Sequence, residues 1–343
     1  MIKSEHGGDI FEREIVYDFS ANLNPLGMPE SMKNALQKSI SEWEKYPDPF
    51  CRSLVKRLSE RENFPPENIV CGNGAADVIF RIVQTVKPKK AVVCAPSFSE
   101  YSKALIQNEC EILHYFLSEK SGFALDEKIL EMLDESVQML ILCTPNNPTG
   151  RTIDGELLCR ICEKCEANDI VFLCDECFID FTENAAHAEQ FINPNVVVLK
   201  AFTKIYAMAG LRLGYAFFGD AELAEKVRRN GQFWSVSAPA QTAGEAALDE
   251  KNYLEKTLEL VKKEREFLTE NLRNFGFKVY PSEANFILFY TKLALDEMLL
   301  SEKILIRNCT NFDGLEQGYF RIAVRPHEEN SALVSAIERC LNG

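Results

Sequence analysis

The chain has 343 residues, a formal net charge of −14 and a sequence pI near 5.0. Hydrophobic residues make up 46% and charged residues 26%, the balance of a globular protein large enough to divide into two lobes. We expect no nucleic-acid partner, because no block of basic residues stands out, and no membrane span, because no apolar run is long enough.

The N-terminal residues and the cysteines indicate the cellular compartment in which the protein is expected. The first nine residues lack the apolar core of a signal peptide, and the twelve cysteines are then expected to be reduced thiols in the cytoplasm. The spacing of Cys159, Cys162, Cys165, Cys174 and Cys177 leaves a metal or iron–sulfur site open. We favour a buried helical face and no metal, because apolar residues and cysteines recur there at helical spacing.

Between residues 68 and 220, short apolar runs alternate with segments of helical pattern. The runs lie at 68–71, 91–94, 139–143, 170–174, 196–199 and 215–218. The predicted helices lie at 75–86, 99–110, 154–168 and 182–192. Continuous apolar runs are typical of strands that are covered on both faces. The succession predicts an α/β fold with a largely parallel sheet flanked by helices.

After Pro239 the pattern changes to that of a smaller α+β lobe. The predicted elements are a long helix at 240–275, strands at 277–280 and 284–290, a helix at 293–301, a strand at 318–324 and a helix at 328–341. We therefore expect a large domain at 45–238 and a small domain that combines 1–44 with 239–343.

Polar residues follow the carboxyl ends of the apolar runs, which is where open α/β sheets bind ligands. The Gly72–Ala76 turn opens a predicted helix, so the amides of Ala75 and Ala76 can hold a phosphate, although an ordinary tight turn also explains it. Phe98 follows the second run, where it is either a ligand contact or a core residue.

Three further segments carry side chains suited to catalysis. Asn147 lies in a loop made rigid by two prolines, Thr144–Gly150. Asp175 directly follows a buried run, so its carboxylate needs a partner, either a protonated heterocyclic nitrogen or an internal arginine. Lys204 lies in an apolar segment, where desolvation lowers the pKa of its amine and frees it for imine formation. Arg212 follows in a Gly-Leu-Arg-Leu-Gly turn and suits a phosphate.

These motifs, in this order, resemble those of the fold-type-I pyridoxal-phosphate family over essentially the whole chain. The resemblance implies a mostly parallel seven-stranded sheet and pyridoxal 5'-phosphate as cofactor. It implies that Lys204 carries the cofactor as a Schiff base, that Asp175 holds its ring nitrogen, and that Asn147 bonds its phenolic oxygen. Phe98 is then expected to stack on the ring. The residues that the resemblance assigns to the phosphate are Ala75, Ala76, Thr203 and Arg212.

The resemblance also implies a homodimer and a substrate contact. Tyr46 is expected to reach the phosphate in the neighbouring subunit, and Arg321 is expected to bind the α-carboxylate of the substrate. The chain departs from the family pattern at Phe178, where a tyrosine is frequent, and at Ala201, where serine or threonine is frequent. The first departure removes a bond to the phenolic oxygen, and the second shifts the phosphate contacts to Thr203 and Arg212.

Further segments are similar to the L-threonine O-3-phosphate decarboxylases of cobalamin synthesis, a branch related to histidinol-phosphate aminotransferases. The segments are 6–9, 18–27, 175–181, 234–236, 304–309 and Arg325. This likeness implies a small phosphorylated amino acid as substrate, with its phosphate held by His6, Asn24 and Arg325. Two alternatives stay open: an aminotransferase of the histidinol-phosphate type, and a cofactor-binding protein or regulator that has lost catalysis.

Overall fold

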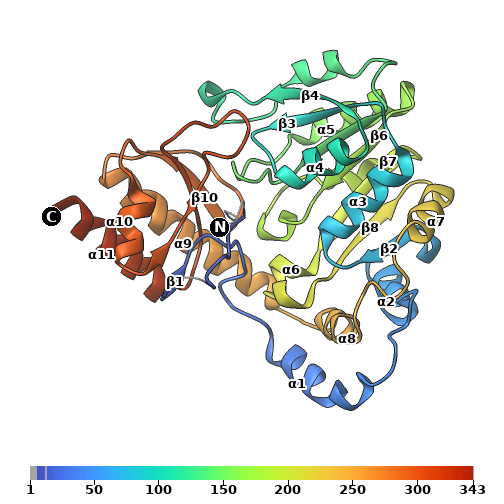
Figure 1. Cartoon of the computed structure of the whole chain (residues 1–343), viewed down its shortest axis with the longest axis horizontal. Helices are drawn as coiled ribbons and strands as arrows, with labels where there is room; N and C mark the ends of the chain where they lie inside the picture. Colours follow the sequence, from blue (N-terminus) through green and yellow to red (C-terminus); the bar gives the residue numbers. More distant parts are fainter. Residues whose placement is uncertain (1–5, 12–13, 343) are drawn as a thin grey trace.

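The computed structural model describes residues 6–11 and 14–342. The prediction that the first nine residues are no signal peptide therefore falls partly outside the described residues. Figure 1 shows two lobes, with most of the green and yellow middle of the chain in the larger and the red C-terminal part in the smaller. The dark-blue N-terminal segment lies between them. In the described ranges, no helix combines the length and the apolar character needed to cross a bilayer.

A seven-stranded sheet forms the centre of the larger lobe within the described residues. Its strand order is β2 (Ile69–Gly72), β8 (Gly214–Phe218), β7 (Val196–Ala201), β6 (Val171–Asp175), β5 (Met139–Cys143), β3 (Lys90–Ala95) and β4 (Glu111–Phe116). Strand β8 is antiparallel to both of its neighbours, and the other neighbouring pairs are parallel. The predicted fold class, a mostly parallel seven-stranded sheet in an α/β protein, is confirmed.

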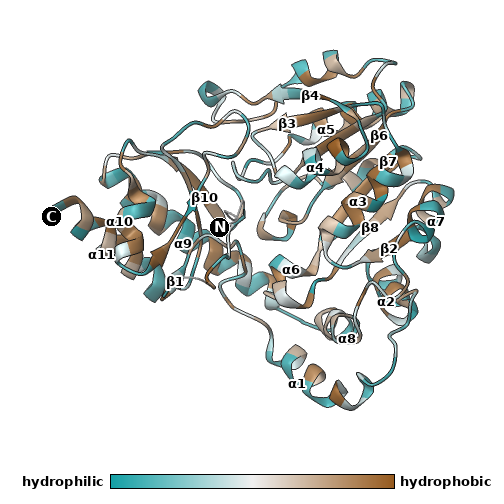
Figure 2. Ribbon diagram, viewed as in Figure 1, coloured by the Kyte–Doolittle hydropathy of each residue, from teal (hydrophilic) through white to brown (hydrophobic). Residues whose placement is uncertain are grey.

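Helices cover both faces of this sheet. One face packs against α3 (Ala75–Val86), α4 (Ser99–Gln107) and α7 (Ala221–Arg229). The other packs against α1 (Glu30–Ser39), α2 (Arg52–Glu62), α5 (Gly155–Ala167) and α8 (Ala238–Ala247). Alternate strand residues face the two cores, with Val92 and Leu140 in one and Val93 and Ile141 in the other. Burial on both faces explains why the strands read as continuous apolar runs, which appear brown in Figure 2.

The smaller lobe is an antiparallel sheet covered by helices. Its strands are β9 (Lys278–Val279), β10 (Phe286–Tyr290), β12 (Arg307–Asn308) and β13 (Tyr319–Ala323), in the order β12-β13-β10-β9. The helices are α9 (Tyr253–Asn274), α10 (Leu295–Ser301) and α11 (His327–Asn342). Their apolar faces share one core with this sheet, for example through Leu268, Leu299 and Leu333.

The N-terminal segment links the two lobes. Strand β1 (Tyr17–Asp18) pairs in parallel with β11 (Ile304–Leu305) of the smaller lobe. A few residues later, the Asn24 N–H donates to the Lys204 carbonyl in the larger lobe, at 3.1 Å. The predicted division into a large domain at 45–238 and a small domain stays a prediction. That division assigns helices α1 and α8 to the small domain, whereas both helices pack in the core beside the larger sheet.

Two sequence-based predictions of helices are wrong. Residues 182–192 form no α-helix but a short 3₁₀ helix, Ala188–Phe191, because the Ala188 N–H donates to the carboxylate of Glu176, at 2.6 Å, instead of to a helical carbonyl. The predicted helix at 240–275 is two helices, α8 and α9, separated at Asn252, which has a φ of +61°. Both keep an apolar face, so the pattern continues across the break.

The buried helical face predicted around the cysteines is confirmed. Helix α5 buries Leu157, Leu158, Ile161, Cys162 and Cys165, and all twelve cysteines are free thiols. Across the described part of the chain, no three or more His, Cys, Asp or Glu side chains are grouped so that they could hold a metal ion.

Candidate active site

A cavity of about 230 Å³ opens where the carboxyl ends of the large-sheet strands face the N-terminal segment and the smaller lobe. Most of the predicted site residues line it. They are His6, Ala75, Ala76, Phe98, Asn147, Asp175, Thr203, Lys204, Arg212 and Arg321. The loops that follow β2, β3, β5, β6 and β7 therefore deliver their polar residues to one place, as expected for an open α/β sheet.

An anion cradle lies at the start of helix α3. Gly74 has a φ of +80°, and a Cβ on it would lie 2.3 Å from Nη2 of Arg212, so the guanidinium packs directly against the turn. A Cβ on Gly214 would likewise lie 2.4 Å from the amide nitrogen of Ala75. The first amides of a helix and a guanidinium together favour a phosphate, and Thr203 adds a hydroxyl at the same wall.

Lys204 lies in the short helix α6 (Phe202–Ile205), directly after β7. Burial, together with the neighbouring guanidinium groups of Arg321 and Arg212, lowers the pKa of its amine to about 8. Its Nζ lies 5.8 Å from the centre of the Phe178 ring. A lysine with such a pKa is a nucleophile near neutral pH.

Asp175 ends strand β6 and is only 4% exposed. Burial raises the pKa of its carboxyl, and hydrogen bonds oppose that effect. The Tyr101 hydroxyl donates to Oδ2 at 2.6 Å, and the Cys177 backbone N–H donates to Oδ1 at 2.9 Å. A buried carboxylate of this kind is a suitable partner for a protonated ring nitrogen.

Asn147 and Arg321 are bonded to each other across the two lobes. Arg321 donates through Nη1 to Oδ1 of Asn147 and through Nη2 to the Ser20 carbonyl, the latter at 2.7 Å. Burial lowers the pKa of Arg321 to about 10. Among the described residues, its Nε has no hydrogen-bond partner, nor does Oδ1 of Asn22, which lines the same cavity. These buried polar atoms indicate a polar ligand.

The two departures from the family pattern both lie at the cavity wall. Phe178 packs edge-on against Phe286, with ring centres 5.0 Å apart, and carries no hydroxyl to donate. Ala201 also lines the cavity and supplies no hydroxyl next to the anion cradle.

The structure does not bring Asn24 to the cavity. Asn24 is 1% exposed, and its Nδ2 donates to the Ile205 carbonyl and to Oγ1 of Thr257, both at 2.8 Å. Its Oδ1 accepts from the Leu26 N–H at 2.9 Å. The amide is thus hydrogen-bonded inside the protein, and its predicted contact with the substrate stays a prediction.

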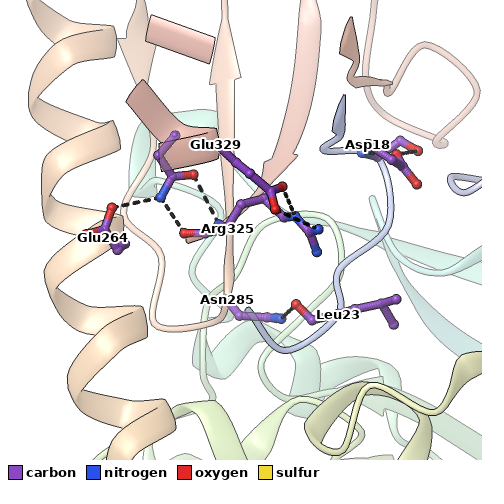
Figure 3. Close-up of polar contacts among 8 residues, drawn as sticks. Asp18, Leu23, Glu264, Asn285, Arg325 and Glu329 are labelled. Carbon is purple, nitrogen blue, oxygen red and sulfur yellow. Dashed lines mark hydrogen bonds and ion pairs between the residues drawn. The ribbon is translucent and has the colours of Figure 1, made fainter. Parts of the chain in front are cut away.

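Arg325 is also directed elsewhere. Its Nε donates to Glu329 at 2.8 Å, and its backbone N–H donates to Asn330, which in turn donates to the buried Glu264 of α9. Figure 3 shows Arg325 beside Glu329 in this network of the smaller lobe. Arg325 is absent from the described residues that line the cavity, and its predicted contact with the substrate phosphate stays a prediction.

Tyr46 does not line the cavity of its own chain within the described part. It is 79% exposed, and its ring stacks on that of Trp234 at 4.4 Å. Its predicted contact with a phosphate stays a prediction about a second copy of the chain.

Sequence reasoning missed Arg307. This residue lies in β12 directly opposite Arg321 in β13, and both line the cavity. Its Nη2 donates to Asn311 at 2.7 Å, and its guanidinium lies over the Phe312 ring at 5.1 Å. Arg307 lies in the segment 304–309, which is similar to the decarboxylase branch, but only the pairing of β12 with β13 shows that its side chain belongs to the site.

The chain matches the family described as aminotransferase class I and II over residues 14–337. It belongs to that family. It is 38% identical to threonine-phosphate decarboxylase of Salmonella typhimurium, over 100% of this chain and 98% of that protein.

Two solved structures share its fold over nearly the whole length. Histidinol-phosphate aminotransferase from Clostridium acetobutylicum matches with a TM-score of 0.89 and 29% identity, covering 95% of this chain and 99% of that one. L-threonine-O-3-phosphate decarboxylase from Porphyromonas gingivalis matches with a TM-score of 0.85 and 26% identity, covering 96% and 100%.

The residues present fit pyridoxal 5'-phosphate, the cofactor of this aminotransferase family. The anion cradle at Arg212 suits its phosphate, Asp175 its ring nitrogen and Asn147 its phenolic oxygen. Lys204 supplies the amine, and Phe98 supplies an aromatic face. The contacts of the individual residues with the cofactor stay predictions.

Proposed function

We propose that this protein is a pyridoxal-phosphate-dependent decarboxylase. It converts L-threonine O-3-phosphate to (R)-1-aminopropan-2-yl phosphate and carbon dioxide in cobalamin biosynthesis. The observation that supports this substrate best is the pair of arginines at the cavity, Arg307 and Arg321, directly opposite each other on neighbouring strands. Two like charges in that position repel each other, so the site suits a ligand with two anionic groups. An amino acid that carries a phosphate has both.

The bound cofactor supplies a carbonyl that holds the substrate amine and a conjugated ring that withdraws electrons from the bonds at the α-carbon. Arg321 binds the α-carboxylate, because it is buried beside Asn147 and keeps Nε available in the described structure. Asp175 holds the proton of the ring nitrogen, and Lys204 receives and returns protons at its Nζ with a pKa of about 8.

The substrate phosphate is assigned to Arg307 and His6, which line the same cavity as Arg321. His6 Nε2 lies 2.8 Å from the carboxylate of Glu100. Anchoring the substrate at Arg307 and at Arg321 fixes which bond at the α-carbon stands perpendicular to the cofactor ring. A carboxylate held in that position leaves as carbon dioxide, whereas a hydrogen held there leads to amino transfer.

We also propose a homodimer in which Tyr46 completes the neighbouring site, in the cytoplasm. Support comes from a cluster of exposed aromatic side chains, Tyr46, Phe50, Phe233 and Trp234. Their rings contact one another in pairs, Tyr46 with Trp234, Phe50 with Phe233 and Phe233 with Trp234. Exposed apolar patches of this kind mark interfaces. The twelve free thiols suit a reducing compartment.

An amino transfer reaction is the second candidate, because the chain also shares its fold with a histidinol-phosphate aminotransferase. The test uses purified protein reconstituted with pyridoxal 5'-phosphate and given L-threonine O-3-phosphate without any keto acid. We expect carbon dioxide and 1-aminopropan-2-yl phosphate. Absence of carbon dioxide, with transfer from histidinol phosphate to 2-oxoglutarate, would assign the protein to the aminotransferases.

Substitution of Arg307 tests the substrate assignment. In Arg307→Gln we expect kcat/KM for L-threonine O-3-phosphate to fall at least about a hundredfold, since a charge-assisted bond to an anion is worth about 1.5–3 kcal/mol and the phosphate accepts more than one. The matched control is Arg339→Gln, which removes an exposed ion pair with Glu302 far along α11. Equal activity in both variants would remove Arg307 from the site.

A further inference from the structure

We propose that Tyr101 is a positioning residue, which keeps the Asp175 carboxylate ionised and aimed at the ring nitrogen of the cofactor. The inference rests on the proposed role of Asp175 and adds to it a residue that sequence reasoning did not single out. Tyr101 lies in helix α4, one turn after Phe98, and its side chain is fully buried at the cavity wall.

The hydrogen bond between the two residues has a defined direction. The Tyr101 oxygen lies 2.6 Å from Oδ2 of Asp175, in a buried setting. An ionised carboxylate only accepts hydrogen bonds, so the phenol must be the donor. Burial and the neighbouring Asp175 charge raise the pKa of Tyr101 well above its usual value, so the phenol keeps its proton throughout the range in which the enzyme is handled.

The bond matters because burial works against the charge on Asp175. The pKa of this carboxyl is raised by desolvation, and the donors Cys177 and Tyr101 and the Lys204 amine counteract it. Cys143 of β5 pairs with Asp175 of β6, and its thiol is also buried. Without the phenol, Asp175 loses the hydrogen bond from Tyr101 and keeps the one from the Cys177 N–H, so the protonated carboxyl becomes more favourable. A protonated carboxyl is a poorer acceptor for a ring N–H.

Tyr101 also fixes the aromatic wall. Its ring meets that of Phe98 edge-on, with centres 5.6 Å apart and an interplanar angle of 83°. One side chain of α4 therefore contacts both the proposed partner of the ring nitrogen and the proposed stacking partner of the ring. Tyr101→Phe removes only the hydroxyl and keeps this packing, so it isolates the hydrogen bond.

The experiment compares Tyr101→Phe with Tyr115→Phe. Tyr115 is a matched control because its hydroxyl donates to Asp126 at the same distance, 2.6 Å, on the surface of the larger lobe away from the cavity. In the apoprotein labelled with ¹³C at the aspartate carboxyl carbons, the titration of Asp175 is followed by NMR. We expect Tyr101→Phe to raise its proton-binding constant at least about tenfold, which is one pKa unit, and Tyr115→Phe to leave it unchanged.

The second readout is the dissociation constant for pyridoxal 5'-phosphate, which we expect to rise about tenfold in Tyr101→Phe alone. In the bound form, the pH at which the cofactor absorbance changes should shift in that variant as well. An unchanged Asp175 titration together with an unchanged dissociation constant would overturn the proposal. Both readouts are independent of turnover, so a protein that binds the cofactor but fails to release carbon dioxide would contradict the proposed function and leave this inference standing.

Discussion

At the scale of single residues, the site depends on burying charged groups next to one another. Lys204 is the clearest case, because desolvation and the guanidinium groups of Arg321 and Arg212 all disfavour its protonated form. The pKa of about 8 means that the amine is mostly protonated at pH 7 and mostly neutral at pH 9. The cations that bind anionic groups of the ligands thus also prepare the nucleophile.

This pKa has a measurable consequence in the apoprotein. We expect the initial rate of imine formation between Lys204 and pyridoxal 5'-phosphate to rise with pH, with a midpoint near 8. In Arg321→Gln, the loss of a neighbouring cation should move the midpoint to higher pH. Rates are measured by stopped-flow absorbance, with Lys204→Ala as the blank. A midpoint above 10 in the unmodified protein would contradict the account.

Asn24 allows a stability test at the same scale. Its amide makes three internal hydrogen bonds in a buried position, so Asn24→Ala should lower the free energy of unfolding by about 1–3 kcal/mol. Asn34→Ala, at an exposed position of helix α1, is the control and should change it little. Urea denaturation of both variants gives the comparison, and equal stability would contradict a structural role for these hydrogen bonds.

Sequence could identify the residues of the site that belong to local motifs. Lys204 and Arg212 lie in one short segment, and Asp175 follows directly on a buried run, so chain order alone indicated them. Arg307 reaches the cavity through the pairing of its strand with β13, and Asn24 bonds to partners 181 and 233 positions away. Such pairings are set by tertiary packing, which local patterns do not encode.

At the scale of elements, the cradle at the start of α3 joins backbone geometry to ligand binding. The turn needs a glycine at position 74 for two separate reasons, a positive φ and the close approach of Arg212. The helix range 75–86 was predicted correctly because its apolar periodicity and its glycine turn agree. The segment 182–192 was predicted wrongly because a buried carboxylate of another loop captures its backbone.

Two glycine variants separate the effect of backbone strain from the effect of the close contact with Arg212. Gly74→Ala should raise the dissociation constant for pyridoxal 5'-phosphate at least about tenfold, because the new methyl group displaces Arg212 and disturbs the helix amides. Gly276→Ala carries the same backbone strain, with a φ of +79°, but its methyl group meets no atom within 4 Å. Fluorescence titration should show a normal dissociation constant for this control. Similar constants for both variants would argue against the cradle.

At the scale of the whole molecule, the cavity lies between parts of the chain that are far apart in sequence. The larger lobe supplies Asp175 and Lys204, the smaller lobe supplies Arg307 and Arg321, and the N-terminal segment supplies His6. The order of elements predicted the two lobes and their fold classes. It did not predict that α1 and α8 pack against the larger sheet, since an amphipathic helix does not specify which core it joins.

The proposed dimer is tested by measuring the mass of the protein in solution. We expect sedimentation velocity to report about twice the chain mass of 38.9 kDa for the unmodified protein. The double variant Phe233→Ser, Trp234→Ser should dissociate, because it removes the aromatic cluster around Tyr46. The control Phe116→Ser alters an equally exposed aromatic residue on the edge strand β4 and should stay dimeric. A monomeric unmodified protein would contradict the proposal.

The central claim is that the cavity directs the reaction to the carboxylate of a phosphorylated amino acid. The most direct test is a competition in one sample that holds the reconstituted protein, L-threonine O-3-phosphate labelled with ¹³C at the carboxylate, histidinol phosphate and 2-oxoglutarate. The account predicts labelled carbon dioxide in step with 1-aminopropan-2-yl phosphate, and little glutamate. Glutamate formed in step with a keto product, with the label retained in the amino acid, would contradict it.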